Sequence, residues 1–141
     1  MNELSLSVTK IINASIQRTF DAWLDKDHFP VFMRPKADMP NPTVTLNPVV
    51  GGEFEILMQV GDNQVPHRGE YLEIERPHRL VFSWKSGFAG ENSVVSISFA
   101  ELSFDQTEVT LTHTKLPSDE SVQGHTEGWV QILKTLSECA S

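Results

Sequence analysis

The chain has 141 residues, of which 39% are hydrophobic and 21% are charged, as expected for one globular domain spanning residues 1–141. Its formal net charge is −8, from 11 Lys and Arg against 19 Asp and Glu. This balance argues against a nonspecific nucleic-acid binder and against attraction to anionic membranes, and no apolar run reaches the roughly 18 residues of a membrane span.

The N-terminal third predicts one strand followed by two short helices. Apolar and polar residues alternate over residues 4–12, which indicates a half-buried strand. Ser15 is suited to cap a helix whose apolar stripe runs through residue 24. We expect Asp27 to cap a second short helix over residues 27–33, with a proline in its first turn.

The middle of the chain predicts an antiparallel sheet. A proline-rich loop precedes an edge strand, and segments with period-two alternation then follow one another between turn residues. The expected strands cover residues 43–46, 53–60, 65–75, 80–84, 95–99 and 109–114.

The end of the chain predicts one long amphipathic helix. Ser118 or Asp119 can cap it, and apolar residues recur at helical spacing from Val122 to Ala140. A helix of about 18–20 residues is near 30 Å long and can span a sheet. We therefore expect an α+β fold, in which a curved antiparallel sheet of about six or seven strands wraps around the C-terminal helix and encloses an apolar cavity.

Several segments, in this order, resemble signatures of the START/birch-pollen-allergen-like (SRPBCC) superfamily. They begin at Asn13 (NASIQRTFDAW), Val50 (VGGEFEI), Gly69 (GEYLEIERPHRLVFSW), Leu111 (LTHT) and His125 (HTEGW). Within that superfamily the chain most resembles homologues of the activator of the heat-shock-protein-ninety ATPase. The resemblance implies the helix-grip fold and a hydrophobic ligand cavity, and it implies no catalytic residues.

The chain departs from that family in two ways. The family often has a Trp-Trp pair where this chain has Phe32-Met33, which changes the side chains expected at the mouth of the cavity. The sequence also lacks a second domain of the eukaryotic co-chaperone type, so activation of a chaperone is not implied.

His113 is the most informative candidate residue, because the alternation of its strand turns it inward. It is either a hydrogen-bonded core histidine or a polar anchor for a ligand. His125 and Trp129 lie one helical turn apart and face the sheet. The full set of cavity candidates is Trp23, Phe32, Met33, Phe54, Met58, Tyr71, Phe82, Trp84, His113, His125 and Trp129.

Three functions follow from this set. The first is a non-enzymatic carrier or sensor of a small apolar or aromatic molecule. The second is an enzyme of the polyketide cyclase or hydrolase kind, with His113 or a His67/Glu70 pair as the acid–base group. The third is an interaction module that docks on a chaperone. No metal or nucleotide motif occurs, so no cofactor is expected.

Two further expectations concern location and assembly. Cys139 is the single cysteine, which excludes an internal disulfide and suits a reducing compartment, and no N-terminal signal pattern is present. The cytoplasm is therefore the expected location. The edge strand over residues 43–46 could also pair between two chains, so a homodimer stays open.

Overall fold

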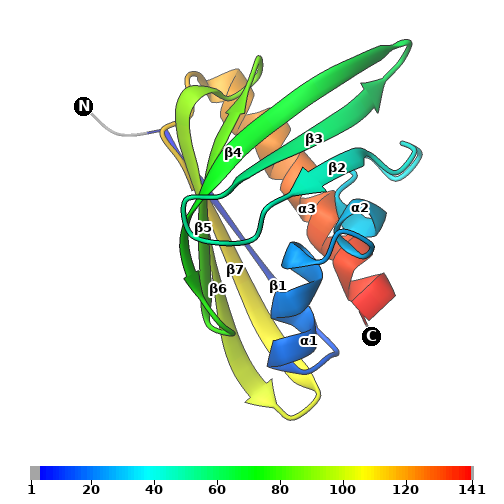
Figure 1. Ribbon diagram of the computed structural model, residues 1–141, viewed down its shortest axis with the longest axis vertical. Helices are drawn as coiled ribbons and strands as arrows, with labels where there is room; N and C mark the ends of the chain where they lie inside the picture. Colours follow the sequence, from blue (N-terminus) through cyan, green and yellow to red (C-terminus); the bar gives the residue numbers. More distant parts are fainter. Residues whose placement is uncertain (1–3, 141) are drawn as a thin grey trace.

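A seven-stranded antiparallel sheet forms one wall of the computed structural model, which describes residues 4–140 (Figure 1). The strands follow one another in space in the order β1-β7-β6-β5-β4-β3-β2. This is the curved sheet that the alternation predicts. Its strands are β1 (Leu6–Ile12), β2 (Thr43–Leu46), β3 (Glu53–Val60), β4 (Asn63–Glu75), β5 (Arg79–Ser86), β6 (Gly90–Ser103) and β7 (Gln106–Thr114).

The helices lie where the sequence predicts them. Helix α1 (Ile16–Asp21) continues into the short 3-10 helix η1 (Ala22–Leu24), and α2 (Phe29–Phe32) follows after a turn. Helix α3 (Asp119–Ala140) has 22 residues, slightly more than expected. Figure 1 shows α3 crossing one face of the sheet, with α1 and α2 beside its C-terminal half.

Side chains cap two of these helices as predicted, whereas the expected cap of α2 is wrong. Ser15 Oγ accepts a hydrogen bond from Arg18 N at 3.2 Å, and Ser118 Oγ accepts one from Ser121 N at 3.1 Å. Before α2, however, the carboxylate of Asp25 accepts the backbone N–H of Asp27 at 2.7 Å. The acceptor is therefore Asp25 and not Asp27, because the turn before α2 begins two residues earlier than the sequence indicates.

Helix α3 leans on one side of the sheet. Among the strands it makes its most extensive contacts with β1, and it also packs against α2. The buried stripe that joins it to the core contains Trp129, Ile132, Leu133 and Leu136. In Figure 1 the β3–β4 hairpin splays away from α3, so the helix and the sheet diverge toward one end.

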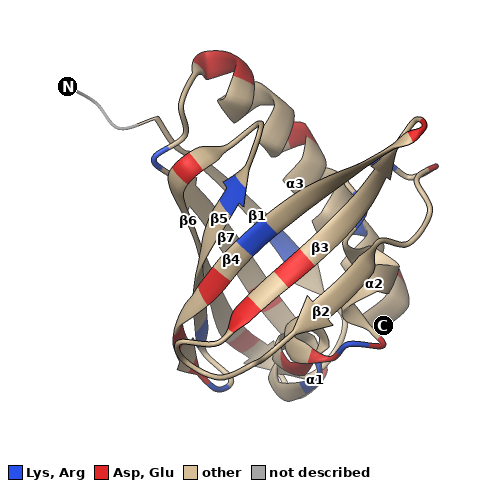
Figure 2. Cartoon of the chain, turned by 45° about the horizontal axis from the view of Figure 1, so that its top comes forward, with Lys and Arg blue, Asp and Glu red and all other residues tan. Residues whose placement is uncertain are grey.

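The opposite face of the sheet carries interspersed charges (Figure 2). Arg68 on β4 pairs with Glu55 on β3 at 2.7 Å, and Arg79 on β5 pairs with Glu73 on β4 at 3.2 Å. These are exposed or half-exposed pairs, which contribute little to stability. Within residues 4–140, no helix is long and apolar enough to cross a membrane.

Gly69 is required where β4 lies close to β5. A Cβ atom at this position would overlap with the carbonyl oxygen of Ser83 and with the ring of Phe54. Both are fixed, because the first belongs to the β5 backbone and the second to the buried core. The close approach of the two strands therefore depends on the absence of a side chain here.

We expect Gly69→Ala to lower the free energy of unfolding by about 1–3 kcal/mol, as typical overpacking does. Gly87→Ala is the matched control, because a Cβ there meets no atom within 4 Å. Urea denaturation of both variants measures the difference. Equal stability of the two variants would contradict the packing described for Gly69.

Candidate ligand-binding cavity

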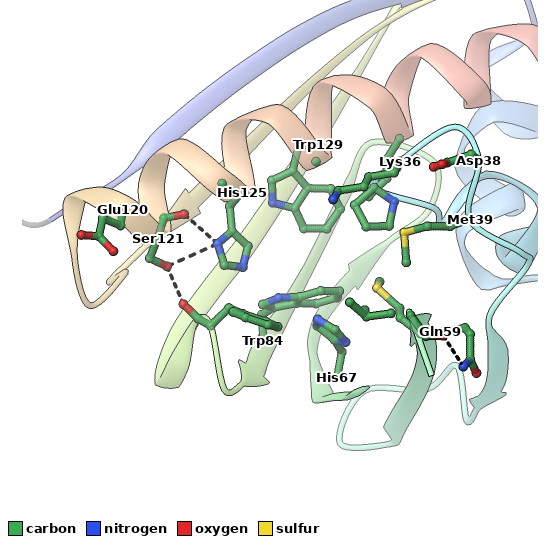
Figure 3. Close-up of a pocket in the computed structure, with 18 of the residues that line it drawn as sticks. Lys36, Asp38, Met39, Gln59, His67, Trp84, Glu120, Ser121, His125 and Trp129 are labelled. Atoms are coloured by element: carbon green, nitrogen blue, oxygen red, sulfur yellow. Dashed lines mark hydrogen bonds between the residues drawn. The ribbon is translucent and has the colours of Figure 1, made fainter. Parts of the chain in front are cut away.

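A cavity of about 760 Å³ opens where α3 and the sheet diverge. Its walls come from α3, β5, the β3–β4 hairpin and the loop that follows α2 (Figure 3). Apolar side chains dominate the interior, and the charged residues that line it are Lys36, Asp38 and Glu120. The lining residues are Pro35, Lys36, Asp38, Met39, Pro40, Met58, Gln59, Val60, Gly61, His67, Trp84, Phe88, Ser118, Glu120, Ser121, Gly124, His125, Gly128, Trp129 and Ile132.

A buried chain of hydrogen bonds ties α3 to the sheet beside this cavity. Trp129 Nε1 on α3 donates to His113 Nδ1 on β7 at 3.0 Å. His113 Nε2 lies 2.9 Å from Ser93 Oγ on β6, and Ser93 Oγ donates to the carbonyl oxygen of Trp84 on β5 at 2.5 Å. These hydrogen bonds therefore link α3 to the three neighbouring strands β7, β6 and β5.

The direction of these bonds fixes the tautomer of His113. An indole N–H can only donate, so His113 Nδ1 must accept, and the ring proton lies on Nε2 and points to Ser93 Oγ. A second proton on the ring would oppose the Trp129 N–H. Burial, with a smaller contribution from the nearby His125, lowers the pKa of His113 to about 3. His113 is thus a neutral core residue with no free nitrogen to offer a ligand.

His125 contributes a free nitrogen to the cavity wall. Its Nδ1 donates to the backbone carbonyl of Ser121 at 2.8 Å, one turn earlier on α3. The hydroxyl of Ser121 in turn donates to the carbonyl oxygen of Phe88 at 2.6 Å and anchors α3 to the β5–β6 turn. Among the described residues, no hydrogen bond reaches His125 Nε2. Burial lowers the pKa of His125, which favours the neutral ring.

His67 also faces the cavity, away from the polar neighbours with which the sequence groups it. It is 6% exposed and lines the cavity, whereas Arg68 and Glu70 line a separate polar groove on the outer face of the sheet. His67 and Glu70 are three residues apart on one strand, so they point to opposite faces. Burial lowers the pKa of His67 to about 4, and its Nδ1 lies 3.2 Å from the carbonyl oxygen of Val65.

The structure brings four of the predicted cavity residues together and places the other seven in the core. Met58, Trp84, His125 and Trp129 line the cavity. Six of the remaining residues form two buried groups beside it, because the inner faces of the strands and both short helices close on one another. Trp23, Phe32 and Met33 pack around α2, and Phe54, Tyr71 and Phe82 pack between β3, β4 and β5. His113 on β7 is also buried, beside the rings of Trp84 and Trp129.

Sequence reasoning missed most of the mouth of the cavity. The helical stripe of His125 and Trp129 extends by steps of three and four residues to Ser121 and Ile132, so this spacing could have identified both. The loop over residues 35–40 has no periodic pattern, and only tertiary packing places it at the mouth. Among residues 4–140, no group of three or more metal-ligating side chains occurs.

Two glycines on α3 have different surroundings. A Cβ at Gly128 would approach Pro35 Cβ at 3.1 Å, so this glycine permits close contact between α3 and the loop. A Cβ at Gly124 would meet no atom within 4 Å, and Gly124 lines the cavity. Glycine costs a helix about 1 kcal/mol relative to alanine. At Gly124 no close packing contact compensates for this cost in helix stability. The absence of a side chain there instead leaves open space in the cavity.

We expect the chain to lose stability as the pH falls from 6.5 toward 4, because buried neutral histidines charge freely only after unfolding. For His67, the pKa of about 4 in the folded chain lies below the ordinary 6.5, so the unfolded chain binds more protons in this range. His67 and His113 should each lower the folding constant by roughly tenfold per pH unit. Urea denaturation at several pH values measures the slope.

The variant His67→Phe isolates one of these contributions, because it keeps a ring in the buried position and cannot bind a proton. Its stability should fall less steeply with pH than that of the unchanged chain. His78→Gln, which changes an exposed histidine, serves as the control and should keep the original slope. Identical slopes for all three proteins would disprove the neutral burial of His67.

Comparison with known proteins identifies the family. A family model described as "Activator of Hsp90 ATPase homolog 1-like protein" matches residues 13–141. No curated protein matches the chain significantly. Among solved structures, CV1439 from Chromobacterium violaceum superposes with a TM-score of 0.81 at 18% identity, covering 96% of both chains.

Two further structures have descriptions that refer to AHSA1 or to HSP90 activation. An AHSA1-like protein from Aeromonas hydrophila superposes with a TM-score of 0.79 at 24% identity, covering 96% of this chain and 90% of the other. PFC0360w, an HSP90 activator from Plasmodium falciparum, superposes with a TM-score of 0.77 at 23% identity, covering 96% and 95%. These likenesses show the helix-grip fold, and with the family match they confirm the expected fold and superfamily. The chain belongs to the activator of Hsp90 ATPase homolog 1-like family.

Proposed function

We propose that the protein binds one small, mostly apolar molecule in the cavity between α3 and the sheet, as a carrier or sensor. The observation that carries this proposal is the cavity of about 760 Å³, which lies within the roughly 300–1,000 Å³ of small-molecule sites. Met58, Trp84, Trp129 and Ile132 supply apolar and aromatic wall area. Burial of such area drives the binding of apolar ligands.

The hydrogen bonds around the cavity favour binding over catalysis. Both nitrogens of His113 are occupied within the protein. His67 and Glu70 lie on opposite faces of β4, so they do not form the carboxylate–histidine pair that acid–base chemistry would use. The cyclase or hydrolase alternative therefore loses the two acid–base groups on which it rests, while a binding role needs neither.

We expect Gly124→Trp to weaken ligand binding at least tenfold, because the new side chain starts in open space and extends into the cavity. Titration with the neutral fluorescent probe N-phenyl-1-naphthylamine measures this effect. The unchanged protein should give a saturable rise in fluorescence. The variant should give a much weaker one while its circular dichroism spectrum stays the same.

Gly124→Ala is the matched control for this experiment. It keeps the cavity nearly empty, so probe affinity should change little, and it should raise the free energy of unfolding by about 1 kcal/mol through helix propensity. A probe that binds the Trp variant as tightly as the unchanged protein would place binding elsewhere. If the probe binds neither the unchanged protein nor Gly124→Ala, the support for a ligand cavity is removed.

A second candidate function is docking on a chaperone of the HSP90 class. The family match over residues 13–141 and the likeness to the HSP90 activator from Plasmodium falciparum favour it. Immobilised protein should then retain purified HSP90. Gly124→Trp should retain as much HSP90 as the unchanged protein if docking uses an outer face. If no HSP90 is retained by either, this candidate is discarded and the ligand proposal is unaffected.

A further inference from the structure

Trp84 has a buried indole N–H with no hydrogen-bond partner, and this residue lines the cavity. Trp84 is 2% exposed, so its indole N–H lies away from bulk solvent. Buried polar groups are nearly always hydrogen-bonded, and an unsatisfied one costs roughly 1–3 kcal/mol. An unpaired donor on a residue of the cavity wall therefore indicates a partner that the folded chain itself does not supply.

Trp23 shows that an unpaired indole can also have an internal explanation. Its Nε1 is equally buried and equally without a partner. Trp23, however, meets the ring of Phe32 edge-on, with ring centres 5.0 Å apart and planes at 71°, and it does not line the cavity. Trp84 also has aromatic neighbours, among them Phe54, Phe82 and Trp129. What distinguishes Trp84 from Trp23 is that Trp84 lines the cavity.

The atom that complements Trp84 is the free nitrogen of His125. In Figure 3 the indole nitrogen of Trp84 lies on the edge of its ring turned toward His125, and the second ring nitrogen of His125 points back toward Trp84. Because His125 Nδ1 donates to the Ser121 carbonyl, a neutral ring leaves Nε2 as an acceptor. One unpaired donor and one unpaired acceptor thus meet at the cavity, with no hydrogen bond between them.

We propose that a hydroxyl group of the bound molecule bridges these two atoms, with its oxygen accepting from Trp84 Nε1 and its hydrogen donated to His125 Nε2. A hydroxyl is the smallest group that accepts and donates at one atom. This inference rests on the proposed ligand-binding function and narrows its ligand class. Trp84 and Trp129 are in contact, with ring centres 5.2 Å apart, and both line the cavity. This shared aromatic surface suits a flat ring, so the ligand class is a phenol or another hydroxylated aromatic molecule.

The charges around the cavity disfavour an anion in the same place. A carboxylate or phosphate only accepts hydrogen bonds, so it would face the lone pair of His125 Nε2 without a proton to share. Two carboxylates, Asp38 and Glu120, line the mouth against a single cation, Lys36. The neighbouring rings of His67 and His113 are also neutral near pH 7, because burial lowers the pKa of each.

Calorimetric titration with 2-naphthol, 2-methylnaphthalene and 2-naphthoate tests the inference. The three probes share a ring system and differ in one group, which is a hydroxyl, a methyl or a carboxylate. Trp84→Phe removes the indole donor. The ratio of the affinity for 2-naphthol to the affinity for 2-methylnaphthalene should therefore fall about tenfold in this variant. The relative affinity removes any change in cavity shape that affects both probes alike.

Trp23→Phe is the matched control, because it removes an unpaired indole N–H outside the cavity. It should leave the relative affinity for 2-naphthol unchanged. His125→Phe removes the acceptor and should act like Trp84→Phe, so it replaces that variant if Trp84→Phe does not fold.

Each contrary result has its own meaning. An unchanged relative affinity in both cavity variants, or tighter binding of 2-naphthoate than of 2-naphthol, overturns the hydroxyl inference while the apolar cavity stands. If neither 2-naphthol nor 2-methylnaphthalene binds the unchanged protein, the proposed function itself fails.

Discussion

The hydrogen-bond chain from Trp129 through His113 and Ser93 to Trp84 is the contact on which the rest of this structure depends. It joins α3 to β7, β6 and β5 through atoms that are all buried. Each member satisfies its neighbour, so removing any one leaves a polar group unpaired in a low-dielectric core. This series of hydrogen bonds therefore fixes the position of α3 over the sheet and, with it, the width of the cavity.

The same contact divides the interior into a filled part and an open part. On one side, aromatic rings from β3, β4 and β5 pack on one another, and Trp23 packs with Phe32 around α2. On the other side, Gly124 and the splayed β3–β4 hairpin leave space that the chain does not fill. The cavity therefore lies beside a core that is packed by other residues.

The histidines illustrate how environment assigns different roles to one residue type. Both ring nitrogens of His113 form hydrogen bonds within the protein, whereas His125 and His67 each use one ring nitrogen to bond a backbone carbonyl. Burial lowers the pKa of all three. Only His67 and His125 line the cavity, and each keeps a second ring nitrogen that its backbone hydrogen bond does not use.

The sequence by itself determined the elements and their inward faces. Alternation with period two placed the strands, helical spacing placed α3, and Ser15 and Ser118 marked two helix starts, because these signals are local. The inward orientation of His113, Trp84 and Trp129 followed from the same periodicity. The predicted cap of α2 was wrong, because the side chain of Asp25, and not that of Asp27, accepts the hydrogen bond in the turn before this helix.

Only the tertiary structure decided which inward residues line a cavity and which fill the core. Phe54 and Met58 share a face of β3, yet Phe54 packs with Tyr71 while Met58 reaches the cavity. That difference depends on which segments pack over each end of β3, and these segments are remote in sequence, so no local pattern encodes it. The free nitrogen of His125 likewise emerges only once its other nitrogen has found the Ser121 carbonyl, because hydrogen-bond partners are assigned by the packed fold.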